Sequence, residues 1–555
     1  MNSMAHKELD APRSSSSAAA PIDISDAHPP PPDLSPLFSD DDLTPLICAS
    51  FVADYNCAAP QPERAALRLV SKCARRLMDG LCRAYVDRRL HVGAEGGDIS
   101  AAHIGTQAAA AMHLLGPLAE LVLEGLDDDG LTAVLGAACS GSGAELVTLA
   151  LPRSKFEGLA CASSLAPLPK LLDLDLSGCG SLTDEALGDL VAACPALSRL
   201  RLTLNARLRE PQLTCPTLRS ATLAICSNLR DAAVARLCAG ALELRELSLW
   251  RCSSLVAPEI RGPRLQSVNL CECVALDDRA LVSLTDAVAC PALSCLLLAG
   301  CDALSAAAPT LGGALLTTLD LSDLACLSDA PLSAACAATP HLQRLDVSRS
   351  TQLVLPELGG PALSALICSH CAGLADEAAS AACERSPRLA TLMLSLCTSL
   401  YAPRLHGEHL AEVNLSGCSQ LTDGAVSFLC RSSPRLSRLG LSLCAALAAP
   451  KVCGACLTRL DMAHCEALAN PTLGGPRLTE LNLCGCARLP DGPLEAACAA
   501  CPALQRLCVD GCAALREPRL ASATLQALSC QGISPQVLGA ASDRTRCPAL
   551  LKVRS

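Results

Sequence analysis

The sequence predicts an α/β solenoid, with a parallel β-sheet on the concave face and convex segments that alternate between helical and extended. First, a phrase of the form Leu-x-x-Leu-x-Leu-x-x-Cys recurs along the chain, for example from Leu244, Leu389 and Leu478. Second, hydrophobic residues make up 51% of the chain but aromatic residues only 1%, as suits thin repeat layers with little room for a ring. Third, 555 residues exceed the usual size of a single core.

The recurring phrase resembles the signature of leucine-rich repeats, with cysteine in a slot that often holds asparagine. The slot residues are Cys179, Asn205, Cys226, Cys252, Cys273, Cys301, Leu324, Ser350, Cys371, Cys397, Cys418, Cys444, Cys465, Cys486, Cys512 and Ile533. With two less regular repeats upstream, we expect about eighteen repeats over residues 116–555.

Two kinds of repeat alternate. The spacing from one slot residue to the next is either long or short. Repeats that precede a long spacing carry Leu-x-Asp and then a helical run, so we expect each aspartate to cap its own helix. These aspartates are Asp184, Asp231, Asp278, Asp329, Asp376, Asp423 and Asp491. Repeats that precede a short spacing carry Leu-x-x-Pro-x-Leu, which excludes a helix and predicts an extended segment. Two short spacings follow one another between Cys444 and Cys486, where we expect a gap between convex helices.

The segment before the repeats divides into three parts. Residues 1–33 are rich in Ser, Ala and Pro and are predicted to be a disordered tail. Residues 34–92 are predicted to form a short helical domain, and residues 93–115 a linker that is rich in Gly and Ala. The stretch Leu67-Arg68-Leu69-Val70-Ser71-Lys72, continued by Arg75-Arg76-Leu77, resembles the end of an F-box. The alternative is a plain helical cap on the solenoid.

Composition and charge exclude some classes of function. A net charge of −11 argues against a nucleic-acid or anionic-membrane binder, because both need a basic face. No apolar run reaches membrane-spanning length. The 37 cysteines recur at one repeat position and no basic-then-apolar signal segment precedes them, which favours reduced thiols over disulfides and a cytoplasmic or nuclear location.

Residues that flank the strand leucines are expected on the concave surface. The charged or amide side chains among them, with the single tryptophan, are Asp173, Asp175, Arg199, Arg201, Glu246, Trp250, Asn269, Asp320, Arg344, Asp346, Glu412, Asn414, Arg438, Arg459, Asp461, Glu480, Asn482, Arg506 and Asp510. The predicted contact set for a protein partner is Trp250, Glu246, Arg199, Arg201, Arg344, Asp346, Arg438 and Arg459. Two alternatives stay open: Trp250 covers a local irregularity, and the charged column forms solvated ion pairs only.

The sequence predicts no catalytic residue, no cofactor and no metal ligand. Cys453 and Cys456 form a lone CxxC, which is weak evidence for zinc without a second pair. His370 and His464 each precede a slot cysteine, but inward-facing cysteines are poor nucleophiles. We therefore predict that the chain is not an enzyme.

The cysteine slot and the Leu-Thr-Asp helix starts, as at Leu182-Thr183-Asp184, resemble the cysteine-containing repeats of F-box/leucine-rich-repeat proteins. That resemblance implies a substrate-recognition adaptor of a Skp–cullin–F-box ubiquitin ligase, with the substrate on the concave sheet. Residues facing the Skp-type adaptor would be Leu43, Leu46, Leu69 and Val70. The alternative is an interaction scaffold unrelated to ubiquitin, whose N-terminal helices only cap the solenoid.

Overall fold

The computed structural model describes residues 89–92, 119–127, 129, 134, 145–154, 168–286, 288–304, 315–531, 550 and 552–554. All of them belong to one compact unit, Ser71–Ser555. The predicted tail and the four predicted adaptor-facing residues lie outside the described residues.

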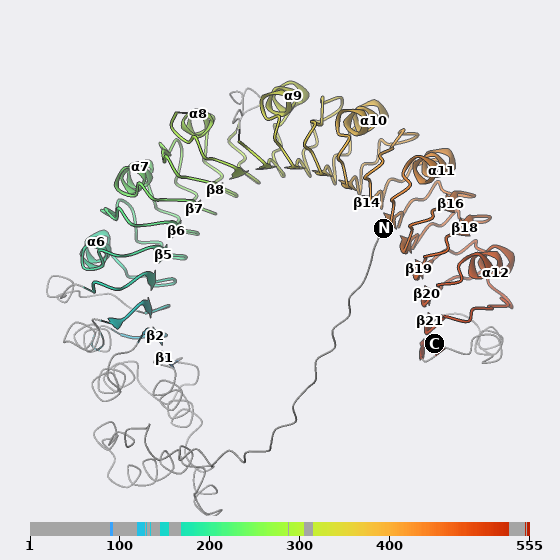
Figure 1. The fold of residues 1–555 in the computed structure, drawn as a ribbon, viewed down its shortest axis with the longest axis horizontal. Helices are drawn as coiled ribbons and strands as arrows, with labels where there is room; N and C mark the ends of the chain where they lie inside the picture. The colour runs from blue at the N-terminus through green and yellow to red at the C-terminus, as the bar shows by residue number, and fades with distance from the viewer. Residues whose placement is uncertain are drawn as a thin grey trace, which may run out of the picture. The chain divides into compact units, whose positions relative to one another are not determined.

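Twenty strands of this unit form one parallel sheet in which each strand pairs with the next along the chain. They are β1 (Arg89–Val92), β2 (Glu120–Leu123), β3 (Thr148–Ala150), β4 (Asp173–Asp175), β5 (Arg199–Arg201), β6 (Ser220–Thr222), β7 (Glu246–Ser248), β8 (Ser267–Asn269), β9 (Cys295–Leu297), β10 (Thr318–Asp320), β11 (Arg344–Asp346), β12 (Ala365–Ile367), β13 (Thr391–Met393), β14 (Glu412–Asn414), β15 (Arg438–Gly440), β17 (Arg459–Asp461), β19 (Glu480–Asn482), β20 (Arg506–Cys508), β21 (Ala527–Ser529) and β22 (Lys552–Arg554). Within the unit, the strands lie along the inner side of an arc and the helices along its outer side (Figure 1). This architecture confirms the predicted leucine-rich-repeat solenoid.

The sheet begins before the predicted range of the repeats and ends within it. The eighteen expected repeats correspond to β2 through β21, and β1 and β22 are additional. β1 pairs with β2 from Arg89 opposite Glu120 to Val92 opposite Leu123. The sheet therefore begins inside the range 34–92 that was assigned to the helical domain, and before residue 116, where the solenoid was expected to start.

The slot cysteines join successive repeats by hydrogen bonds. In twelve repeats the slot thiol donates to the backbone carbonyl that follows the strand of the preceding repeat, as Cys418 does to Leu394 at 3.2 Å. Asn205 makes the same contact with its amide, at 3.0 Å from the oxygen of Leu176. Burial raises the pKa of Cys226 to about 11 and that of Cys418 to about 12. These thiols therefore stay protonated and act as structural donors.

On the convex side, the described residues form seven helices: α6 (Asp184–Ala192), α7 (Asp231–Gly240), α8 (Arg279–Thr285), α9 (Asp329–Ala338), α10 (Asp376–Arg385), α11 (Asp423–Ser432) and α12 (Asp491–Ala500). Six begin at the predicted aspartate, and α8 begins directly after Asp278. Within the described residues, no helix has the length and apolar character needed to cross a membrane.

The helix-start aspartates act differently from the prediction. Each carboxylate that opens one of the six helices accepts two successive backbone amides of the following repeat, at 2.8 to 3.1 Å. In α6 and α11 the capping side chain is the preceding threonine, Thr183 or Thr422. The aspartates thus join a helical repeat to the extended repeat after it, and the prediction that they cap their own helices is wrong.

The expected gap between α11 and α12 is also filled. Where two short repeats follow one another, β16 (Lys451–Cys453) and β18 (Thr472–Gly474) pair in parallel as a second, two-stranded sheet. β16 packs against α11, and β18 packs against α12. Two adjacent extended segments satisfy each other's backbone groups there, so the convex side stays closed.

Candidate functional site

The concave surface presents two aligned columns of side chains. We call the residue before each buried strand leucine the first column and the residue after it the second column. The strands are in register, so that Arg438 of the first column lies opposite Glu412 on one side and Arg459 on the other. Column neighbours on adjacent strands are about 4.8 Å apart, close enough for direct contact.

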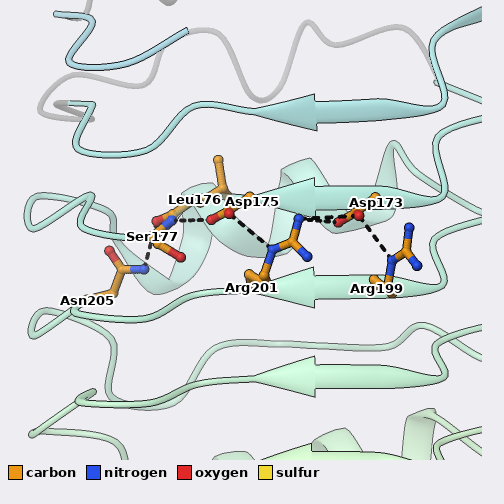
Figure 2. Close-up of polar contacts among 7 residues, drawn as sticks. All are labelled: Asp173, Asp175, Leu176, Ser177, Arg199, Arg201 and Asn205. Carbon is orange, nitrogen blue, oxygen red and sulfur yellow. Dashed lines mark hydrogen bonds and ion pairs between the residues drawn. The ribbon is translucent and has the colours of Figure 1, made fainter. Parts of the chain in front are cut away.

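Four charged side chains form a compact network on β4 and β5. Arg199 donates through Nε to Asp173 at 3.0 Å, and Arg201 donates through Nε to Asp175 at 3.0 Å. A second nitrogen of Arg201 lies 3.1 Å from Asp173, so that this carboxylate bridges both arginines. Asp175 also accepts the backbone amide of Ser177 at 2.9 Å (Figure 2). The sheet therefore holds both predicted contact arginines in fixed orientations.

A longer ladder of charge occupies the first column from β14 to β20. Arg438 pairs with Glu412, while Arg459 and Arg506 both pair with Glu480. The three arginine side chains keep 54%, 54% and 61% of their surface exposed. All three arginines are thus paired with the two glutamates of the column, and each still has exposed surface for a partner.

A hollow of about 610 Å³ lies over the C-terminal part of this ladder. It is lined by side chains of β17, β19, β20 and β21, including Arg459, Asp461, Glu480, Asn482 and Arg506. Its lining combines these charged and amide side chains with the leucines of the four strands, so it suits a peptide segment that carries both polar and apolar groups.

Arg344 and Asp346 flank the same leucine on β11. Asp346 accepts the backbone amide of Ser348 at 3.0 Å. Burial raises the pKa of the Asp346 carboxyl, and the neighbouring charge of Asp320 adds to that rise. Arg344 is exposed in the first column.

Trp250 lies beyond the end of β7 and is half-buried. Its indole nitrogen donates to Glu272 at 3.1 Å, and the guanidinium of Arg251 lies 4.8 Å from the ring centre. Arg251 also donates to Glu272 at 2.6 Å, which closes a three-residue cluster. Glu246 contacts Ser220 instead of the tryptophan. The sequence missed Glu272 because it lies directly before a slot cysteine, outside the strand columns.

The eight predicted contact residues thus lie at four separate places on the sheet. Arg199 and Arg201 belong to the β4–β5 network, and Arg438 and Arg459 are neighbours in the C-terminal ladder. Arg344 and Asp346 share β11, whereas Trp250 and Glu246 belong to the β7 repeat.

Cys371 and Cys465, the two slot cysteines that follow a histidine, have a structural role. Cys371 donates to the oxygen of Val347, and Cys465 to that of Leu441. Burial raises the pKa of both thiols to about 11. Such thiols are poor nucleophiles at neutral pH. Cys453 of the CxxC lies exposed on β16, away from the concave sheet.

The fold and this surface define a leucine-rich-repeat solenoid with a charged concave sheet. Neither protein-family models nor curated proteins give a match to the chain. Among solved structures, a chain of the Rad7–Elc1 complex in yeast is 17% identical with a TM-score of 0.35, covering 63% of this chain and 84% of that one. TLR13 in complex with ssRNA13 is 16% identical with a TM-score of 0.35, covering 76% of each chain.

Proposed function

We propose that the chain is a protein-binding receptor whose concave sheet holds an extended segment of a partner protein. We further propose that it serves as the substrate-recognition adaptor of a Skp–cullin–F-box ubiquitin ligase. In this role the N-terminal segment would attach to a Skp-type adaptor, through Leu43, Leu46, Leu69 and Val70. The substrate would be presented for ubiquitin-dependent degradation.

The observation that supports protein binding best is the ladder of Glu412, Arg438, Arg459, Glu480 and Arg506. Exposed ion pairs of this kind contribute at most about 1 kcal/mol each, so a partner can exchange them at little cost. Carboxylate or phosphate groups can bind arginine through two parallel hydrogen bonds. With three arginines against two glutamates, the ladder fits an acidic or phosphorylated segment.

The charge pattern favours a protein partner over nucleic acid. A phosphate backbone needs a continuous basic face. Here acids interrupt the arginines in the C-terminal ladder, and the β4–β5 network has two acids for two arginines. The net charge of the chain is −11. Such mixed charges suit a protein surface, which itself carries both signs.

The ligase role rests on the F-box resemblance and is tested by binding to a purified Skp-type adaptor. We expect the full chain to co-elute with the adaptor in size-exclusion chromatography and Leu69→Glu to lose that complex, because a charge would enter the apolar contact. Arg459→Glu is the matched control: it alters the concave ladder and should leave adaptor binding intact.

A wild-type chain that does not bind the adaptor would contradict the ligase role. The concave receptor function would then stand as that of a scaffold unrelated to ubiquitin. Loss of adaptor binding in Arg459→Glu, with an unchanged circular dichroism spectrum, would contradict the assignment of the two surfaces to two partners.

A further inference from the structure

Two cysteines and one aspartate meet on the concave side near the C-terminal end of the sheet. Cys508 is the last residue of β20, and Asp510 follows two positions later on the same side. Cys484 belongs to the preceding repeat, just beyond β19. All three are partly exposed. They stand outside the slot of the cysteine ladder, so the fold does not need a thiol at either cysteine position.

The donor atoms of these three residues are placed for one metal ion. The two sulfurs and a carboxylate oxygen all lie within 4.8 Å of one another. The sulfur of Cys508 is 3.3 Å from Oδ2 of Asp510. Tetrahedral zinc, with bonds of about 2.3 Å to sulfur and about 2.1 Å to oxygen, needs sulfur–oxygen separations of about 3.6 Å and sulfur–sulfur separations of about 3.8 Å. Both values lie below the 4.8 Å that bounds the separations of the three donor atoms.

The carboxylate of Asp510 is already oriented by its neighbours. The Ser529 hydroxyl lies 2.9 Å from Oδ1 and 2.8 Å from Oδ2, and the backbone amide of Gln531 donates to Oδ1. Hydrogen bonds of this kind hold metal-binding carboxylates in position. A metal ion bound here would replace the Cys508 proton. Oδ2 of Asp510 would then lose the hydrogen bond from the thiol and gain a bond to the ion.

We propose that Cys484, Cys508 and Asp510 bind one zinc ion. Two thiolates and one carboxylate suit zinc and other soft divalent ions, whereas magnesium and calcium prefer oxygen alone. Each thiol that becomes a ligand releases its proton, so binding frees two protons per ion. Cys508 and Ser529 also line the concave hollow. The fourth coordination position therefore opens toward the surface on which the partner binds, and water or a partner side chain completes the tetrahedron.

Cobalt(II) is a spectroscopic probe for this site in the full-length chain, purified with a phosphine reductant and freed of metal by a chelator. We expect one equivalent of Co(II) to give the visible absorption of a tetrahedral ion and a near-ultraviolet thiolate band. One equivalent of Zn(II) should displace both signals. Calorimetry in buffers of different ionisation enthalpy should show the release of two protons.

Cys508→Ser and Asp510→Asn should each weaken Co(II) and Zn(II) binding at least tenfold. The matched controls are Cys326→Ser and Cys453→Ser, because both thiols are exposed and neither belongs to the group. These controls should bind as the wild type does. Circular dichroism of every variant in chelator verifies that the fold is retained.

Three results would overturn the proposal. The first is no uptake of Co(II) or Zn(II) by the reduced wild type at micromolar concentrations. The second is uptake that stays unchanged in both Cys508→Ser and Asp510→Asn. The third is a disulfide between Cys484 and Cys508 in protein isolated without reductant, combined with no metal uptake after reduction, which would assign the two thiols to a redox pair.

Discussion

At the scale of single residues, the position before each slot residue has a left-handed backbone. It holds glycine in some repeats, such as Gly417 and Gly485, and leucine, isoleucine, arginine, histidine, glutamate or aspartate in others, and φ lies between +56° and +78° at each described position. Its amide donates to the next repeat, as Ile225 does to the oxygen of Trp250 at 2.6 Å. The repeat therefore imposes this conformation even on a β-branched side chain, at a cost of about 1–2 kcal/mol.

Gly485 has a second constraint, which gives a stability prediction. A β-carbon there would overlap the imidazole ring of His464, in addition to the strain of φ at +70°. We expect Gly485→Ala to lower the free energy of unfolding by about 1–3 kcal/mol. The measurement is the midpoint of thermal unfolding, with hydrogen exchange of β19 and β20 as a local readout.

Gly492→Ala is the control for that substitution. Gly492 lies in the first turn of α12, where an added β-carbon would meet no atom within 4 Å. Alanine there should leave the midpoint unchanged or raise it slightly, because alanine favours helix. Equal midpoints for the two variants would show that neither the overlap with His464 nor the positive φ destabilises the alanine variant.

At the scale of elements, the helix-start aspartates connect neighbouring repeats, and α10 provides a matched test. Asp376 accepts the backbone amides of Tyr401 and Ala402 at 2.9 and 2.8 Å. Asp376→Ala leaves both amides without their acceptor, so we expect a loss of about 1–3 kcal/mol in unfolding free energy. The measurement is urea unfolding, followed by circular dichroism.

Glu377 is the neighbouring acid in the same first turn, exposed to solvent. Glu377→Ala removes the same favourable interaction with the helix dipole, worth about 0.3–1 kcal/mol, but no link between repeats. A loss in Asp376→Ala no larger than that in Glu377→Ala would show that the aspartate acts only on its own helix.

Most strands and helices could be located from the sequence, because each strand and each helix start has a recognisable local sequence pattern. The strand leucine and the Leu-x-Asp start are local signals, and both recur where the structure has strands and helices. The partners of Asp376 lie 25 and 26 residues away, so a rule for helix caps chose the wrong amides. The pairing of β16 with β18 was missed for the same reason: either extended segment alone has no partner, and only their adjacency creates one.

At the scale of the whole molecule, the parallel register made the charged columns predictable. The column from Glu412 to Arg506 follows directly from counting residues in the repeats, and its members do pair on the sheet. Contacts outside the columns were not predictable in this way. Glu272, in the turn after β8, accepts a hydrogen bond from Trp250, and Asp510 lies close to Cys484 of the preceding repeat. Both contacts depend on the directions of side chains in the turns after the strands. Counting residues within the repeats does not predict those directions.

The buried thiols should also make the whole solenoid sensitive to alkaline pH. Burial raises the pKa of many slot cysteines from about 9 to about 11 or 12, as for Cys226, Cys418 and Cys486. Above pH 9 the unfolded chain loses these protons while the folded chain keeps them. The folded state then binds more protons, so the free energy of unfolding falls as pH rises, by up to about 1.4 kcal/mol per pH unit for each thiol.

Because several slot thiols contribute at once, we expect the thermal midpoint to be nearly constant from pH 7 to 8 and to fall steeply from pH 9 to 10.5 in the presence of a reductant. The chain has only three tyrosines and six lysines, so most groups that titrate in this window are cysteines; they include the helix cysteines Cys238 and Cys383, whose pKa burial also raises to about 11. Cys418→Ala should reduce the steepness of the fall, since one buried thiol is gone, whereas Cys326→Ala, at an exposed position, should leave it unchanged. A midpoint that stayed constant up to pH 10.5 would mean that the slot thiols are not protonated donors, and that another interaction holds successive repeats together.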